Sequence, residues 1–161
     1  MRPVDRRPGS RAALFWIYVG AALFLVALLG SAIVVPELRL LHSFQALIYV
    51  AVIVLARRNS PWGYGAGFAI AIVWNAMSLL VSRLIQTGAV AIWSWLRTGQ
   101  IQQVAPMMVT LGGTGHFILI VAALVAVASQ STDERKWWKF AGGGALSIAY
   151  FALLVAFSRP H

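Results

Sequence analysis

The stretch from Ala12 to Val35, AALFWIYVGAALFLVALLGSAIVV, indicates that this chain folds in a lipid membrane. It contains no charged residue, and it is followed directly by Pro36, which interrupts helices. A helix needs about 20 apolar residues to cross a hydrocarbon layer about 30 Å thick, and this run exceeds that length. The run is also longer than the apolar part of a secretory signal peptide. We therefore expect a first membrane span that the mature protein keeps.

Four more apolar runs follow, at about 38–56, 63–84, 107–129 and 140–157. None of them alternates apolar and polar residues as the strands of a membrane barrel do. Hydrophobic residues make up 60% of the chain and charged residues only 11%, whereas about a quarter of residues are charged in soluble domains. The sequence therefore predicts an all-α polytopic membrane helix bundle with five transmembrane helices. We expect a single transmembrane domain over residues 12–158, with its first span at 12–35, after a basic cytoplasmic tail at residues 1–11.

A polar and aromatic segment at about 88–104 separates the third run from the fourth. It is too short to cross the membrane and return as helices. Its mixture of Trp93 and Leu96 with Arg97 and several glutamines favours a helix lying on the outer membrane surface. A re-entrant hairpin is the alternative. Both forms return to the side they left, so the five-span count is unchanged.

Lysines and arginines divide unequally between the two sides of this topology. Nine of the 13 fall on the side that carries the N-terminus, namely Arg2, Arg6, Arg7, Arg11, Arg57, Arg58, Arg135, Lys136 and Lys139. Loops rich in these residues stay in the cytoplasm. We therefore expect a bacterial-type inner (plasma) membrane protein with its N-terminus in the cytoplasm and its C-terminus outside.

Several classes of function are not favoured by the composition. The net charge of +9 comes from short clusters between apolar runs rather than from one basic surface, so we do not expect binding to nucleic acid. The chain has no cysteine, which excludes disulfides and thiolate metal sites. No nucleophile with a base and an acid partner is evident at membrane depth, which argues against an enzyme. The partners we expect are the lipid bilayer and other membrane subunits or further copies of this chain.

One face of the third run is built from small and polar residues. Gly63, Gly67, Ala71 and Asn75 recur every four residues, and Ser78 and Ser82 continue the row at helical spacing. Small residues let helix backbones approach closely, and polar side chains in lipid need a partner. This face should therefore look into the bundle. The simplest explanation is that its polar groups tie helices together by hydrogen bonds, and the alternative is a binding site.

Arg83 ends the same run close to the outer boundary. An arginine there can extend its guanidinium to the headgroups, or pair with Glu37 on the same side. The functional alternative is a cation that binds an anion at the mouth of a pocket.

Two histidines lie on neighbouring spans. His42, Gln45 and Tyr49 share one face of the second run, and His116 follows three glycines on the fourth. Imidazoles from facing helices can act as the axial ligands of a haem iron, so His42 and His116 are candidate metal ligands and haem b is a possible cofactor. A histidine near a helix end is otherwise an interfacial polar group.

The candidate ligand-binding site combines polar residues of three spans with one tryptophan. Its members are His42, Gln45, Trp74, Asn75, Ser78, Ser82, Arg83 and His116. Three functions are compatible with them. The first is a non-enzymatic accessory or anchoring subunit of a larger membrane assembly, and the second is a haem- or quinone-binding redox protein with a site in the outer leaflet. The third is a small oligomeric transporter or channel.

Overall fold

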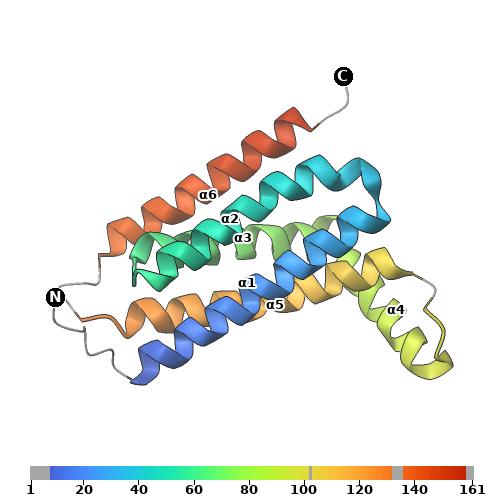
Figure 1. The fold of residues 1–161 in the computed structure, drawn as a ribbon, viewed down its shortest axis with the longest axis horizontal. Helices are drawn as coiled ribbons and strands as arrows, with labels where there is room; N and C mark the ends of the chain where they lie inside the picture. The colour runs from blue at the N-terminus through green and yellow to red at the C-terminus, as the bar shows by residue number, and fades with distance from the viewer. Residues whose placement is uncertain (1–7, 102, 132–135, 159–161) are drawn as a thin grey trace.

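The computed structural model describes residues 8–101, 103–131 and 136–158, and every regular element in these ranges is a helix (Figure 1). The elements are α1 (Pro8–Val34), the 3-10 turn η1 (Pro36–Leu38), α2 (Arg39–Arg57), α3 (Pro61–Ala76), the π-helix η2 (Met77–Val81), α4 (Leu84–Thr98), α5 (Val104–Ala128) and α6 (Trp137–Phe157). The predicted all-α helix bundle is confirmed. Most of the predicted tail at 1–11 lies outside the described residues, and so does His161 at the C-terminus.

Five of the described helical segments are long and apolar enough to cross a membrane. They are Arg11–Val34, Pro36–Arg57, Pro61–Val81, Val104–Ala128 and Trp137–Phe157. Each corresponds to one predicted span, with ends that differ by a few residues. These helices fit an integral membrane protein that passes through the bilayer several times.

Prolines set two of the helix boundaries. Val35 is extended, with φ −124° and ψ 87°, because the residue before a proline is pushed out of the helical region. The chain can therefore turn from α1 into η1 at Pro36. Pro61 is the first residue of α3, a position where its missing N–H costs nothing.

Helices α1 and α5 cross where two glycines face each other. A Cβ added to Gly20 would lie 2.6 Å from the carbonyl oxygen of Gly115, and one added to Gly115 would lie 2.7 Å from that of Gly20. Any side chain at either position would force the helices apart. Helix α5 also packs against α3 and α4, so it occupies the middle of the fold.

The small face of α3 looks into the bundle, as predicted. Gly63 lies against Leu55 and Ala56 of α2, and Gly67 lies close to Val52 and to Leu119 of α5. Ala71 and Asn75 continue this face and are buried. A different set of glycines joins α3 to α6: Gly65, Gly143 and Gly144. The close approach of backbones expected for small residues in membrane helices is therefore used on two sides of α3.

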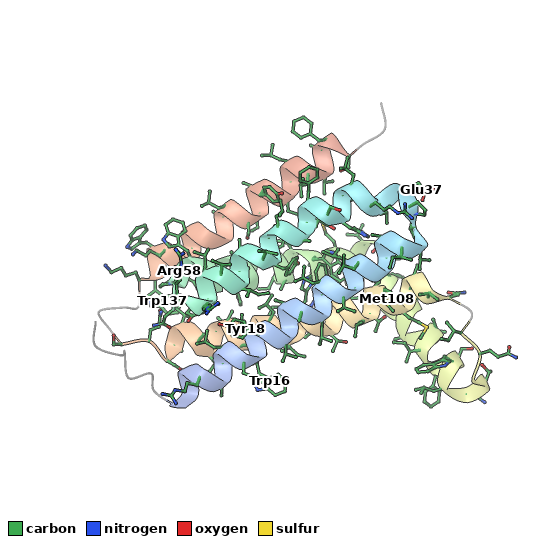
Figure 2. All side chains as sticks on the ribbon, in the orientation of Figure 1. Trp16, Tyr18, Glu37, Arg58, Met108 and Trp137 are labelled. Atoms are coloured by element: carbon green, nitrogen blue, oxygen red, sulfur yellow. The ribbon has the colours of Figure 1, made fainter. Side chains whose placement is uncertain are left out.

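The start of α1, the turn between α2 and α3 and the start of α6 lie at one end of the bundle (Figure 1). Arg58 and Trp137 mark this end in Figure 2, and Glu37 and Met108 mark the other. We call the end marked by Arg58 and Trp137 the basic end. Its described cations are Arg11, Arg57, Arg58, Lys136 and Lys139. Since α6 finishes at the opposite end, the described chain crosses the bundle an odd number of times.

Helix α4 projects sideways from the end opposite the basic end (Figure 1). It is attached to α5, because Gly88 packs directly on Pro106 and Thr110, and the Thr110 hydroxyl donates to the carbonyl oxygen of Ile85 at 3.0 Å. A helix is therefore present where the sequence predicted one between the third and fourth spans. It begins at Leu84 rather than near residue 88, because the third span stops at Val81 and the chain turns at Arg83, which has φ +53°.

Candidate functional site

A cavity of about 490 Å³ lies between α1, α2, α5 and η2, toward the end of the bundle opposite the basic end. Five of the predicted site residues line it, namely His42, Gln45, Trp74, Ser78 and Ser82. Most of the remaining lining is apolar, including Leu28, Leu41, Met77, Met108 and Val109. The cavity therefore joins a hydrocarbon-like wall to a small group of polar side chains, which is the usual composition of a small-molecule site.

Polar side chains of α2 and η2 line this cavity. Gln45 of α2 is 7% exposed and Ser78 of η2 is 4% exposed, and neither side chain hydrogen-bonds to another described residue. The Nδ1 atom of His42 is buried without a partner, while its ring lies close to the backbone carbonyl of Leu28. An unpaired buried polar group costs about 1–3 kcal/mol. This cost applies to Nδ1 of His42, whereas the polar atoms of Gln45 and Ser78 are not fully buried and can be reached from the cavity.

Ser31 of α1 also lines the cavity and is buried. The sequence did not single it out, because a lone serine in an apolar span usually bonds to its own helix. Its position opposite α2 becomes visible only when α1 and α2 are packed together.

The π-helix η2 contains Ser78, and Ser82 follows its last residue. Its last turn closes through the backbone N–H of Ser82, which donates to the carbonyl of Met77 at 3.0 Å, and the Ser82 hydroxyl reaches the same carbonyl at 3.3 Å. Such widened turns inside α-helices are frequent at functional sites. Ser78 is buried at the cavity wall, whereas Ser82 is exposed at its rim.

An aromatic cluster forms the inner end of the cavity. Phe24 and Trp74 both line the cavity, and their rings meet edge to face at 5.1 Å. Behind them lies His116, whose ring stacks on Phe24 at 3.9 Å and meets Trp74 edge to face at 4.9 Å. His116 itself is not a lining residue. Phe24 and Trp74 therefore separate the cavity from this histidine.

His116 is completely buried and is held by Tyr49 of α2. The Tyr49 hydroxyl and the Nε2 atom of His116 are 2.6 Å apart, and Nδ1 of His116 is buried without a partner. The sequence placed Tyr49 on one helical face with His42 and Gln45, but not in the site. Its partnership with His116 depends on how α2 and α5 pack, which no local pattern reveals.

Asn75 lies beside the cavity where α3 meets α5. Neither its amide nitrogen nor its amide oxygen has a hydrogen-bond partner among the described residues. A Cβ added to Gly113 would be 3.7 Å from the Asn75 oxygen and 2.8 Å from Cδ1 of Ile85, so α4 also reaches this point. The helix-to-helix hydrogen bond expected for Asn75 is not found in the part of the chain that the structure describes.

Arg83 is exposed and does not line the cavity. Its backbone adopts the left-handed conformation and its carbonyl accepts a hydrogen bond from the Thr87 hydroxyl at 3.1 Å. Within the described residues 8–101, 103–131 and 136–158, no ion pair joins Arg83 to Glu37. The pairing considered from the sequence is therefore not observed. The residue stands at the junction of η2 and α4.

The two histidines are not arranged to grip one haem. His42 lines the cavity, but His116 lies behind Phe24 and its Nε2 atom already meets Tyr49. A macrocycle between both rings would have to displace Phe24, and ligation through Nε2 would break the bond to Tyr49. Among the described residues, no group of three or more histidine or acidic side chains could hold a metal ion.

Comparisons with known proteins add no assignment to this geometry. No family model matches the chain, and no curated protein or solved structure shows significant similarity to it.

Proposed function

We propose that this integral membrane protein binds an amphiphilic ligand, of which a quinone is an example, in the cavity between α1, α2, α5 and η2. The observation that carries this proposal is the set of unpaired polar side chains, Gln45 and Ser78 with His42, in a cavity of about 490 Å³ whose other walls are mostly apolar. Such a cavity matches a molecule with a polar head and an apolar body.

The chemistry of these side chains fits a head group with carbonyl or hydroxyl oxygens. The Gln45 amide offers two N–H donors and a carbonyl acceptor, and the Ser78 hydroxyl both donates and accepts. Gln45 and His42 are three positions apart on α2, so they face the ligand from the same side. Trp74 and Phe24 offer flat apolar surfaces for the ring of such a ligand.

The sidedness of the site is part of the proposal. Positively charged loops stay in the cytoplasm, so the basic end faces the cytoplasm and the cavity belongs to the outer leaflet. The proposal therefore has the N-terminus inside and the C-terminus outside, in a bacterial-type inner membrane.

A role as an accessory subunit is a second proposal. It is supported by the exposed apolar side chains of α4, namely Val90, Trp93 and Leu96, which a partner subunit or the membrane surface can cover. Transport by one chain receives less support. Between Tyr49 and the basic end the buried core includes the apolar side chains Val52, Ala56, Ala123 and Val127, which offer no polar path.

Ligand binding can be tested with the purified full chain in lipid nanodiscs. A short-chain benzoquinone should raise the midpoint of thermal unfolding, because a ligand that binds only the folded state stabilises it. Gln45→Leu should weaken binding about tenfold, the effect of losing one hydrogen bond. Gln100→Leu, at an exposed position outside the cavity, is the matched control. Equal responses of the two variants, or no response of the unmodified protein, would contradict the proposal.

A further inference from the structure

A second hollow, an apolar groove of about 290 Å³, runs along the surface where α2, α3 and α6 meet. Its walls include Ala51 and Leu55 of α2, Trp62 and Ala66 of α3, and Leu146 of α6. The groove is separate from the cavity described above, because the two share no lining residue.

The hydroxyl groups that line this groove are already satisfied. Ser147 is hydrogen-bonded to the carbonyl oxygens of Gly144 at 2.9 Å and of Ala66 at 3.2 Å. The Tyr150 hydroxyl donates to the carbonyl oxygen of Phe44 at 3.1 Å. A ligand in the groove therefore needs no hydrogen-bonding group, whereas a ligand in the cavity can bond to Gln45 and Ser78. Hydrocarbon is the chemistry that fits it.

One mouth of the groove lies at the basic end. Arg58 directly follows the last residue of α2, three positions after Leu55, and Lys139 precedes Gly143 by four on α6, so both cations lie next to the lining residues at this end. The Lys139 ammonium lies 5.5 Å from the ring centre of Trp138, which meets Trp62 edge to face at 5.7 Å. Tryptophans of this kind gather at the level of lipid headgroups.

We propose that the groove binds one acyl chain of an anionic phospholipid, whose phosphate lies between Arg58 and Lys139. From Leu55 to Leu47 the groove follows α2 for eight residues, or about 12 Å at 1.5 Å per residue. This length is close to half of a hydrocarbon layer about 30 Å thick, so a single leaflet supplies the lipid. The two cations at the mouth select a lipid with net negative charge over a zwitterionic one.

The test compares lipids of different charge on the intact chain. Native mass spectrometry of the protein released from micelles, with phosphatidylglycerol and phosphatidylcholine of identical chains in competition, should show preferential retention of phosphatidylglycerol. Arg58→Gln and Lys139→Gln should each lower this preference about fivefold, since a cation near an anionic surface contributes that factor. Arg97→Gln, which removes an exposed cation from α4, should leave it unchanged.

A second variant tests the groove itself. Ala51 is exposed, so Ala51→Phe places a ring in the groove without disturbing the core, and it should reduce retention of both lipids. Ala22→Phe, at an exposed position of α1, is its control. Glycerol phosphate alone should not compete, because it lacks the acyl chain. Equal retention of the two lipids by the unmodified protein, full competition by glycerol phosphate, or unchanged retention in Ala51→Phe would overturn the proposal.

Discussion

The phenol of Tyr49 and the imidazole of His116 meet at 2.6 Å between α2 and α5, where the two residues are 2% and 0% exposed. Neither group can turn to water, so each depends on the other for its hydrogen bond. The pair lies directly behind the aromatic end of the cavity, with Phe24 stacked on the histidine. It therefore fixes the back wall against which a ligand would rest.

Removing the tyrosine hydroxyl should cost stability because the histidine nitrogen loses its partner. We expect Tyr49→Phe to lower the free energy of unfolding by about 1–3 kcal/mol. His116→Phe in the same chain should cost less after Tyr49→Phe than in the unmodified protein, since the interaction is already lost. A double-mutant cycle on denaturant unfolding in micelles measures this coupling. Strictly additive effects of the two changes would show that the hydrogen bond is absent.

Removing the Asn75 amide, unlike removing the Tyr49 hydroxyl, should not lower stability. Its amide is 4% exposed and lacks a partner among the described residues, so Asn75→Leu should leave stability unchanged or raise it. Thermal unfolding of the ligand-free protein in detergent checks this, with Asn75→Ala as a control for the loss of packing. A clear loss of stability in Asn75→Leu, close to that in Asn75→Ala, would mean that the amide is paired. Transport through an oligomer makes a separate prediction, because Asn75→Leu would then abolish solute flux into liposomes.

The crossing of α1 and α5 should tolerate no side chain. A Cβ at Gly20 would lie 2.6 Å from the Gly115 carbonyl oxygen and 3.0 Å from the Leu119 nitrogen, both of which belong to backbone. We expect Gly20→Ala to destabilise the protein by about 1–3 kcal/mol, as overpacking does. Resistance to proteolysis in micelles reports this loss. The control is Ala22→Leu, on the exposed face of α1. Gly99→Ala would not serve, because Gly99 has φ +70° and an alanine there would itself strain the backbone.

The proposed orientation in the membrane can be tested with single introduced cysteines, since the chain itself has none. Glu37→Cys and Arg58→Cys lie at opposite ends of the bundle (Figure 2). A membrane-impermeant maleimide should label Glu37→Cys in intact spheroplasts and Arg58→Cys only after the membrane is opened. The reverse pattern would place the cavity in the cytoplasmic leaflet. Labelling of both from outside would contradict the membrane-spanning arrangement of α2.

The positions of the five spans could be predicted because hydropathy alone decides them. Lipid has no partner for backbone polar groups, so long apolar runs have to be helices whatever their neighbours do. The row of small residues from Gly63 to Asn75 was equally accessible, since helical spacing is a local property and the face proved to be buried.

Features that depend on packing between helices escaped the sequence. The third run predicted a regular helix to residue 84, whereas the chain widens into η2 at Met77 and turns at Arg83. Nothing in the local pattern of MSLLV distinguishes a π-turn from an α-turn. His42 and His116 were both recognised as candidates, but Phe24 stands between the cavity and His116, and this residue looks like any other apolar member of α1.

The backbone contact between Gly20 and Gly115 also decides which wall of the protein can move. Where two helix backbones touch without side chains between them, no rotamer change can separate the helices. We therefore expect α1 and α5 to move together as one rigid unit. If the proposed ligand enters the cavity, we expect α2 or the π-helix η2 to move to admit it. Crosslinks between α1 and α5 should consequently be harmless to ligand exchange, while those that tie α2 to α1 should arrest it.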